Sequence, residues 1–390
     1  MVNSAMATPA CILTDVAAAL AQYGPHNNTE VRESEMVCEQ ARADWRDWLG
    51  LLLTPGLGPR QAWQSLQQQP TPQAWAQPGP DWPAQCAATQ AWLERDTNHF
   101  LVTLHDTDYP QALRDLADPP LLLFGAGQRA LLQAPRALAM VGSRNPTPLG
   151  QRTAYDLARE LAEQGVVVAS GLARGIDGAA HRGALDAGGC SVAFVGTGVD
   201  RVYPRAHAEL AQKLTAHGVL LSELPLGSAA LRHHFPRRNR LLAAWTQGTL
   251  VVEASLGSGS LITAHVALDL GREVMAVPGS IHAPQAKGCH ALIKQGAALI
   301  EGTQDVGHAM GWRTPSARAD SAKPSQASAV ASPQGDAAKV WAHLSDAPQH
   351  IDTLSQLSGL APATLQAVLL SLELDGYVAS LPAGQWQRLT

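Results

Sequence analysis

The feature that most constrains this chain is a regular alternation of short apolar runs and helical segments between residues 137 and 310. The apolar runs fall at 137–141, 166–169, 191–195, 219–221, 250–252 and 274–277, with a weaker one at 297–300. They are continuous rather than alternating with polar residues, as in strands buried on both faces. This pattern predicts an α/β fold, a Rossmann-like parallel sheet with helices on both faces, whose ligands bind at the carboxyl ends of the strands.

The chain of 390 residues is too long for one ordinary core. We expect a poorly ordered segment (1–40), an N-terminal helical domain (41–105), the Rossmann-like domain (106–310), a flexible Ser-, Ala- and Pro-rich linker (311–335) and a winged-helix domain (336–390). The helical domain resembles a SAM or helix-hairpin-helix unit, because a Gly-Leu-Gly turn at 56–58 separates two helical stretches. That turn either binds a phosphate through its amides or is only a tight connection. Pro59, which removes an amide, favours the connection.

The C-terminal region predicts three helices, at 339–344, 351–359 and 364–374, followed by a hairpin from 376–378 and 386–389. This is a winged-helix pattern. The third helix carries Glu373 and no Lys or Arg, so its face repels phosphate and argues against a regulator that reads duplex DNA. We therefore interpret the domain as a protein-interaction module.

The composition of the chain limits the classes of function that it can have. The net charge of −5 means that binding to nucleic acid must come from a local basic patch. The five cysteines are scattered without a CxxC pair, which indicates reduced thiols and no zinc site. No apolar run approaches the roughly 20 residues of a membrane span, and the N-terminus lacks a signal-peptide pattern. We expect a cytoplasmic protein without metal, cofactor or membrane attachment.

Loops of small residues follow almost every predicted strand of the sheet. They lie at 142–144, 170–177, 196–200, 257–260 and 278–280. Glycine lets a ligand approach the backbone, and amides at helix starts attract anions. The dinucleotide fingerprint GxGxxG is broken by Arg201, and there is no Walker A sequence. Five such loops at one sheet edge predict an anion-binding surface, whereas a single loop would be only a short turn.

A basic cluster at residues 232–240 adds to this surface. It contains four arginines and two histidines in nine residues, with Phe235 in the middle. Guanidinium groups suit bidentate contacts to phosphate, and an exposed aromatic ring offers a face for a base. His233 and His234 have no carboxylate or cysteine at ligand spacing, so a metal site is not favoured. The cluster predicts binding of nucleic acid rather than a merely solvated helix start.

In this order, the motifs resemble the DNA-processing protein A family (DprA, also called Smf). The resemblance covers roughly residues 108–305 and rests on six blocks. These are Gly-Ser-Arg at 142–144, Ser-Gly-Leu-Ala-Arg-Gly-Ile-Asp at 170–177, Gly-Thr-Gly-Val-Asp at 196–200, Tyr-Pro at 203–204, Phe-Pro-Arg-Arg-Asn-Arg at 235–240 and Ser-Gly-Ser-Leu-Ile-Thr-Ala at 258–264. Two departures are Arg232, where lysine is common, and His290, where asparagine is usual. The planar fork of Arg232 should retain phosphate binding.

The resemblance implies a dimeric protein that binds single-stranded DNA entering during natural transformation, a form of DNA uptake in competent cells. Such proteins protect the strand, displace single-strand-binding protein and load the RecA recombinase for DNA recombination. The implied DNA-binding residues are Arg144, Arg232, Phe235, Arg238, Arg240, Ser143, Gly142, Ser170, Gly171, Arg174 and Gly175. Loop-structuring roles are expected for Asn239, Asp177, Gly257, Ser258 and Gly259. A dimer interface is expected around Leu292, Ile293 and Leu299, although Leu292 and Ile293 equally fit a core-facing helix stripe.

An enzyme is the alternative interpretation, since related Rossmann-like proteins bind nucleotides or hydrolyse nucleoside monophosphates. Such an activity needs a carboxylate at a strand end as general base or ribose anchor. Glu253, Asp177 and Asp200 are candidates, but no matched acid and base pair is evident in the sequence. We therefore predict a DNA-binding protein that is not an enzyme.

Overall fold

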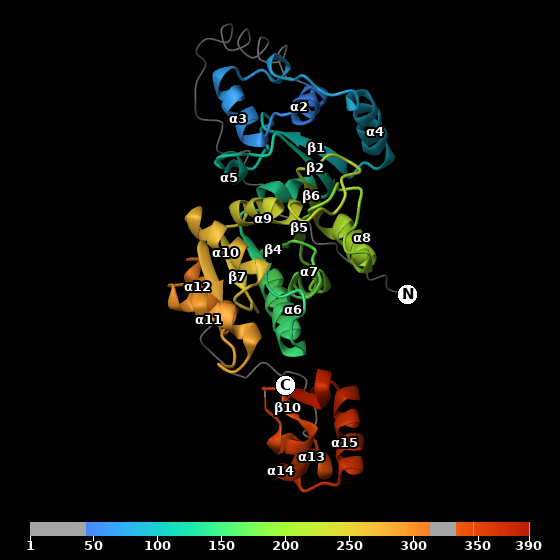
Figure 1. The fold of residues 1–390 in the computed structure, drawn as a ribbon, viewed down its shortest axis with the longest axis vertical. Helices are drawn as coiled ribbons and strands as arrows, with labels where there is room; N and C mark the ends of the chain where they lie inside the picture. The colour runs from blue at the N-terminus through green and yellow to red at the C-terminus, as the bar shows by residue number, and fades with distance from the viewer. Residues whose placement is uncertain (1–43, 313–332, 346, 390) are drawn as a thin grey trace, which may run out of the picture. The chain divides into compact units, whose positions relative to one another are not determined.

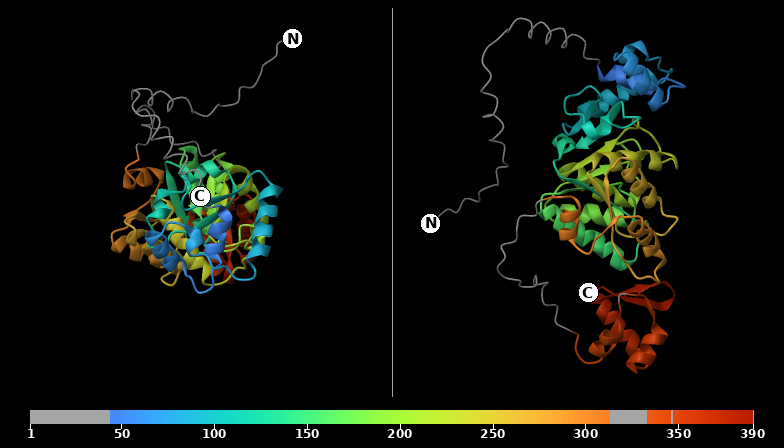
Figure 2. Two further views of the ribbon diagram at one scale, coloured as in Figure 1. Left: turned by 90° about the horizontal axis from the view of Figure 1, so that it is seen from above. Right: turned by 90° about the vertical axis from the view of Figure 1, so that its left-hand side faces the viewer.

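The computed structural model describes residues 44–312, 333–345 and 347–389. Its main body is a nine-stranded sheet with the order β1-β2-β6-β5-β4-β3-β7-β8-β9 (Figures 1 and 2). The seven strands from β3 to β9 are parallel to one another. They are β3 (Ala137–Val141), β4 (Val167–Ser170), β5 (Ser191–Phe194), β6 (Val219–Ser222), β7 (Gly248–Val251), β8 (Glu273–Ala276) and β9 (Ala298–Leu299). Each matches a predicted apolar run within two residues, so the prediction of a Rossmann-like parallel core is confirmed.

Two further strands, which the sequence pattern did not predict, extend the sheet at one edge. β1 (His99–Thr103) pairs antiparallel with β2 (Leu122–Gly127), and β2 pairs antiparallel with β6. The sheet is therefore mixed, and it begins before residue 106, where the sequence placed the start of the Rossmann-like domain. Both strands are almost wholly buried, so neither shows the alternation that marks a half-exposed antiparallel strand.

Helices cover both faces of the sheet. α6 (Pro148–Glu163), α7 (Ile176–Asp186), α8 (Ala208–His217) and α12 (Thr303–Ala309) form one layer, in which α6 packs extensively on α7. α9 (His234–Trp245) and α10 (Gly259–Asp269) pack on each other over the other face, and α11 (Lys287–Lys294) packs on β8. Apolar residues of β3, β4 and β7 meet α6 and α7 in one buried cluster. This is the doubly wound arrangement that places ligand sites at strand ends.

The N-terminal helices pack on the antiparallel pair rather than forming a core of their own. They are α2 (Trp45–Leu52), α3 (Pro59–Gln68), α4 (Trp82–Arg95) and the short α5 (Gln111–Arg114). Trp92 of α4 stacks on His99 of β1 at 4.2 Å between ring centroids and lies 6.3 Å from Phe124 of β2. In the turn between α2 and α3, the N–H of Leu57 donates to Thr54 and that of Gly58 to Gln61. These bonds favour the tight connection over a phosphate site.

The C-terminal domain has its own core. It contains α13 (Asp336–His343), α14 (Ile351–Ser358), α15 (Pro362–Leu374) and a small sheet in the order β10-β12-β11, from Gln349–His350, Gln385–Arg388 and Val378–Leu381. Leu354, Leu365, Leu369, Leu372 and Trp386 are buried together in it. Three helices with a β-hairpin wing confirm the predicted winged helix.

The expected poorly ordered segment at 1–40 lies outside the described residues, as does most of the expected linker at 311–335. Within the described ranges, no single helix is long and apolar enough to cross a membrane. The bent pair of α14 and α15 passes the same test of length and composition only when the two are taken together.

Candidate nucleic-acid interface

From β3 the chain adds β4, β5 and β6 on one side of the sheet and then adds β7, β8 and β9 on the other side of β3. β3 and β7 are therefore neighbours in the sheet although about 110 residues apart in sequence. In an open parallel sheet this reversal leaves a crevice beyond the carboxyl ends of the two strands. A cavity of about 730 Å³ lies there. It is lined by Val141, Gly142, Ser143, Arg144, Ala173, Asp177, Tyr203, Ala230, Arg232, Phe235, Pro236, Arg238, Asn239, Leu242, Ser255, Ser258, Gly259, Ser260, Ile262 and Thr263. Three of the five loops that the sequence singled out, those at 142–144, 170–177 and 257–260, therefore meet at this cavity, whereas those at 196–200 and 278–280 do not line it.

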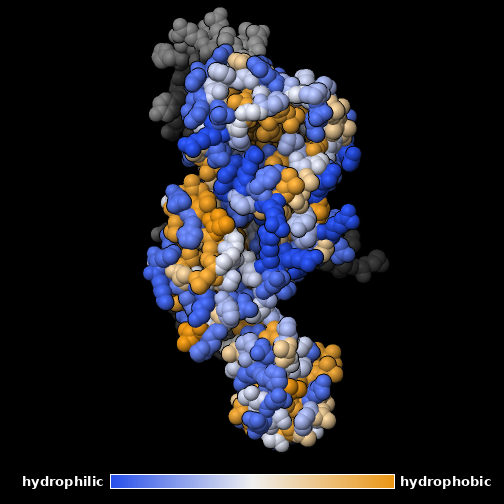
Figure 3. Space-filling view, in the orientation of Figure 1, coloured by the Kyte–Doolittle hydropathy of each residue, from blue (hydrophilic) through white to orange (hydrophobic). Residues whose placement is uncertain are grey.

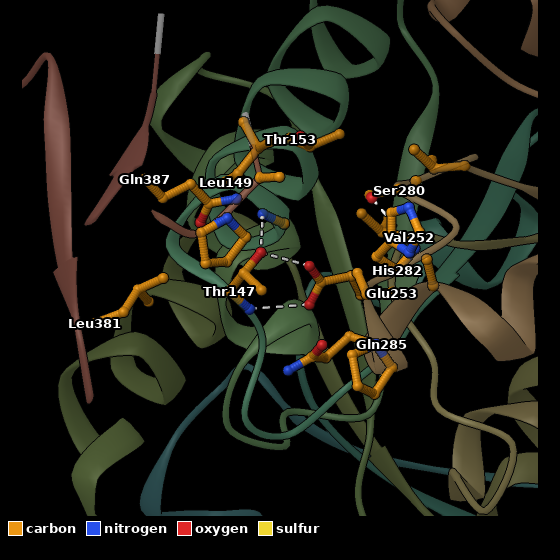
Figure 4. Close-up of a pocket in the computed structure, with 18 of the residues that line it drawn as sticks. Thr147, Leu149, Thr153, Val252, Glu253, Ser280, His282, Gln285, Leu381 and Gln387 are labelled. Carbon is orange, nitrogen blue, oxygen red and sulfur yellow. Dashed lines mark hydrogen bonds between the residues drawn. The ribbon is translucent and has the colours of Figure 1, made fainter. Parts of the chain in front are cut away.

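The loop that carries Arg144 is held at both ends by Glu253. Glu253 lies two residues beyond the end of β7, and its backbone carbonyl accepts the N–H of Ser143 at 2.7 Å. Its carboxylate accepts the N–H of Thr147 at 2.9 Å and the Thr147 hydroxyl at 2.5 Å (Figure 4). Burial raises the pKa of Glu253, while the bonds from Thr147 act in the opposite direction. Glu253 thereby fixes the path of residues 143–147 and the orientation of Arg144.

Arg144 and Phe235 lie against each other across the cavity. The Arg144 guanidinium carbon is 5.4 Å from the centroid of the Phe235 ring, within the range of a cation–π contact. Arg232 is exposed on the same rim and makes no side-chain hydrogen bond or ion pair with any residue in the described ranges. Two guanidinium groups and an aromatic ring thus face one cavity, which can take a phosphate and an unstacked base.

Arg238 has a different environment from the one that the sequence predicted. Its side chain is buried, and its guanidinium donates to the carbonyls of Gly171 and Phe194 and, at 2.9 Å, to the side chain of Asn239. Asp177 lies nearby and accepts the N–H groups of Gly171 and Ala173 at 3.1 and 3.3 Å. Burial raises the pKa of Asp177, and the adjacent charge of Arg238 counteracts that effect. Arg238 therefore ties α9 to the ends of β4 and β5, and it also lines the cavity.

Arg240 is likewise committed to the protein. Its guanidinium lies 2.5 Å from the Glu223 carboxylate and 3.3 Å from that of Asp118. Arg237 forms a second ion pair with Glu223 at 3.0 Å. Of the four arginines in the basic cluster, only Arg232 leaves its charge uncompensated at the cavity. Both Arg238 and Arg240 are engaged within the protein, and the expectation that they contact DNA stays a prediction.

The remaining loop residues have mixed roles. Ser170 is fully buried and its hydroxyl donates to the Met140 carbonyl at 2.6 Å, which assigns it to the core rather than to a ligand surface. A Cβ on Gly171 would lie 2.3 Å from the Arg238 guanidinium, so glycine is required there for packing. Gly175 has a φ of +79°, and a Cβ there would lie 2.3 Å from the Ser143 carbonyl oxygen. Arg174 is exposed and faces a second cavity.

The Gly-Ser-Gly loop at 257–259 begins helix α10 at the cavity rim. The hydroxyl of Ser258 accepts the N–H of Ser260 at 3.3 Å as the helix N-cap. Ser258 and Gly259 line the cavity and Gly257 does not. The N-terminus of α10 thus lies at the cavity, and a helix N-terminus favours an anion.

Three residues were expected at a dimer interface, and they lie in different surroundings. Leu292 is 2% exposed and belongs to the core, as the alternative interpretation of this helix allowed. Ile293 is half-buried, whereas Leu299 is 46% exposed on β9, the last strand of the sheet. Nearby, Ile262 and Leu268 are exposed on α10, where Figure 3 shows an apolar patch. Of the three predicted residues, Leu299 is the one that offers a substantial exposed apolar surface.

The fold and the site define a class of protein, a doubly wound α/β domain joined to a winged helix, whose arginine-lined cavity at the switch point suits an anion. Comparison with known families identifies the family to which this chain belongs. The family model of the DNA recombination-mediator protein A matches residues 100–311, and a model of the DprA winged helix domain matches residues 323–384. The chain belongs to the DNA recombination-mediator protein A family, as its motifs predicted.

Characterised relatives agree with this membership. Protein Smf of Escherichia coli is 40% identical over 298 residues, which are 75% of this chain and 78% of that protein. DNA processing protein DprA of Streptococcus pneumoniae is 43% identical over 201 residues, 52% of this chain and 71% of that protein. The X-ray structure of DNA processing protein A from Streptococcus pneumoniae superposes with a TM-score of 0.58 at 34% identity, covering 67% of this chain and 96% of that one.

Proposed function

We propose that this protein binds single-stranded DNA in the cavity between Arg144, Arg232 and Phe235, and that it acts without catalysing a reaction. The observation that carries the proposal is the convergence of two uncompensated guanidinium groups and an aromatic ring on one cavity at the switch point. Guanidinium groups bind phosphates, and an aromatic face stacks on a base that is free of its partner strand. Duplex DNA keeps its bases stacked inside, so this geometry favours a single strand.

The position of the carboxylates argues against the enzyme alternative. Among the described residues, Asp177 is the one carboxylate that lines the cavity, and its oxygen is engaged by the amides of Gly171 and Ala173. Glu253 is bound to Thr147 and does not line the cavity. A hydrolase would need a free general base within reach of its substrate. Neither carboxylate meets that requirement.

Binding of labelled oligonucleotides, followed by fluorescence anisotropy, tests the proposal. Wild type should prefer single-stranded to duplex DNA. The Arg144→Ala/Arg232→Ala variant should lose roughly 10²- to 10⁴-fold in affinity, since it removes two charge-assisted hydrogen bonds of roughly 1.5–3 kcal/mol each. The slope of log affinity against log salt concentration should also become smaller by about 1.4, which is roughly 0.7 for each of the two lost phosphate contacts.

The matched control is Arg152→Ala/Arg159→Ala, which removes the same charge from exposed positions on α6, where each arginine pairs with a carboxylate one turn away. It should bind like wild type. Equal losses in both variants would mean that binding follows overall charge, and unchanged binding in the Arg144 variant would place the DNA elsewhere. Binding of nucleoside monophosphates but of no DNA would revive the enzyme alternative.

We further propose that the protein acts in the cytoplasm during natural transformation and recombination, where it protects the strand, displaces single-strand-binding protein and loads the RecA recombinase. Family membership supports this role. The test is the rate at which RecA assembles on a strand coated with single-strand-binding protein. Wild type should accelerate it and the Arg144→Ala/Arg232→Ala variant should not. Acceleration by the variant would separate RecA loading from this cavity.

The homodimer that the resemblance implies is proposed to form at the β9 edge. The exposed Leu299 and the half-buried Ile293 support that location, together with the apolar side chains on α10. Light scattering should show a dimer for wild type and a monomer for Leu299→Asp. A dimer that persists in the variant would place the interface on another surface.

A further inference from the structure

A second cavity, of about 550 Å³, adjoins the first on the side away from β7. It is built from the loops that follow β3, β4 and β5. Its lining consists of Arg144, Asn145, Gly171, Ala173, Arg174, Gly196, Thr197, Tyr203, Pro204, Arg205 and Phe235. Tyr203 and Arg205 belong to the loop between β5 and α8, and Arg205 was not among the predicted binding residues.

The two cavities share a wall made of side chains. Arg144, Ala173, Tyr203 and Phe235 line both of them. The ring centroids of Tyr203 and Phe235 are 5.7 Å apart, and the ring planes are tilted by 47°. The guanidinium of Arg144 lies over the Phe235 ring. An arginine and two aromatic rings therefore form the partition. A ligand that fills the first cavity ends against groups that also face the second.

The second cavity carries positive charge that the protein does not neutralise. Arg174 and Arg205 are both exposed, and neither makes an ion pair or a side-chain hydrogen bond within the part of the chain that the structure describes. None of its lining residues is a carboxylate. Arg237 and Arg240, by contrast, share Glu223. Free guanidinium groups around a concave surface attract a phosphate and hold it with charge-assisted bonds.

The second cavity also presents an aromatic surface. The side chain of Tyr203 is 51% exposed, an unusual degree for a large ring that contacts another aromatic residue. An exposed ring beside phosphate-binding groups is the arrangement on which successive bases of a single strand stack. Charge and stacking surface thus occur together in the second cavity, as they do in the first.

We propose that the second cavity is a subsite for the adjacent nucleotide of the same DNA strand. Arg174 and Arg205 hold its phosphate, Tyr203 stacks on its base, and Arg144 with Phe235 separates it from the nucleotide in the first cavity. The proposal rests on the proposed binding of single-stranded DNA and specifies how many nucleotides one protein chain reads. Arg205 and Tyr203 become specificity-determining residues for an extended, unpaired strand.

The test measures anisotropy for oligothymidylates of increasing length with three proteins: wild type, Arg174→Ala/Arg205→Ala and Tyr203→Ala. Wild-type affinity should rise as the strand becomes long enough to fill both cavities. The affinity of the double variant should not rise with length in this way, although the variant should bind the shortest detectable oligonucleotide like wild type. Its slope of log affinity against log salt concentration should be smaller by about 1.4. Tyr203→Ala should weaken binding of the longer strands roughly 5- to 100-fold with the slope unchanged.

The matched control is Arg152→Ala/Arg201→Ala, in which Arg201 is an exposed arginine of the same loop that lines neither cavity. Because Arg174 and Arg205 are exposed, the thermal melting of their variant should equal that of wild type. Arg174→Lys/Arg205→Lys keeps both charges and should restore the salt slope.

If the Arg144→Ala/Arg232→Ala variant loses binding while the second-cavity variants match wild type at every length, the second subsite is wrong and the proposed function stands. If wild type binds no single strand, both are wrong. A loss of binding that the control variant shares would also overturn the second subsite, since overall charge would then explain it.

Discussion

At the residue scale, four arginines of one short segment have three different functions. Arg232 leaves its charge at the cavity, and Arg237 and Arg240 share Glu223. Arg238 is buried against two backbone carbonyls and close to Asp177. A buried guanidinium is stable only when its donors and its charge are satisfied, and these partners satisfy them. The proposed DNA surface therefore depends on Arg238, a residue whose hydrogen bonds lie within the protein.

This arrangement predicts a large loss of stability in Arg238→Ala. The substitution leaves the buried carbonyls of Gly171 and Phe194 without this donor, and each unsatisfied buried acceptor costs about 1–3 kcal/mol. Chemical denaturation would measure the free energy of unfolding. Arg232→Ala is the control, and because Arg232 is exposed its change should stay within about 0.5 kcal/mol. Equal stability of the two variants would contradict the structural role of Arg238.

At the element scale, the decisive unit is the connection from β3 to α6, which carries Arg144. It is anchored to β7 through Glu253 and ends at Thr147, the N-cap of α6, whose hydroxyl also accepts the N–H of Gly150 at 3.0 Å. One hydroxyl therefore caps a helix and closes the loop that presents the DNA-binding arginine. Since β3 and β7 are neighbours in the sheet, the anchor also couples the two sides of the switch point.

Thr147→Val should weaken stability and DNA binding together. It removes the N-cap acceptor, at a cost of about 1 kcal/mol, and one of the bonds to Glu253. The freed loop no longer holds Arg144 in place, so we expect affinity for single-stranded DNA to fall several-fold. Thr147→Ser keeps the hydroxyl and should restore both properties. Denaturation and anisotropy on the two variants check this, and a Val variant that binds DNA normally would refute the anchoring role.

At the scale of the whole molecule, the proposed DNA surface belongs to one domain. Every residue that lines the two arginine cavities lies between positions 141 and 263. The winged helix has a separate buried core around Leu354, Leu365 and Leu369. The net charge of −5 means that attraction to DNA is local, arising where arginines are unpaired.

A chain ending at residue 312 should therefore bind single-stranded DNA with an affinity within about twofold of the full chain, since no proposed phosphate contact is removed. Anisotropy on the truncated and full chains measures this, with the Arg144→Ala/Arg232→Ala change in each as control. A loss of tenfold or more would show that the winged helix contributes directly to the DNA interface.

The sequence by itself determined the elements whose signals are local. Continuous apolar runs located β3 to β9, and the glycine-rich loops marked the strand ends that meet at the cavity, because parallel strands bring their carboxyl ends to one edge. Helical periodicity and turn residues located the winged helix. Arg144 lies in one of these loops and Arg232 and Phe235 lie in the basic cluster, and the resemblance to the family singled out all three as binding residues.

Only the tertiary structure decided which of these residues are free to bind. Arg238 and Arg240 look like Arg232 in sequence, and their partners, Gly171, Phe194, Asp118 and Glu223, come from distant segments. The antiparallel edge of β1 and β2, the buried position of Leu292 and the second cavity at Tyr203 and Arg205 also arise from contacts between remote parts of the chain. Local patterns specify strands, helices and residue types, whereas burial and charge compensation depend on which segments meet in the folded chain.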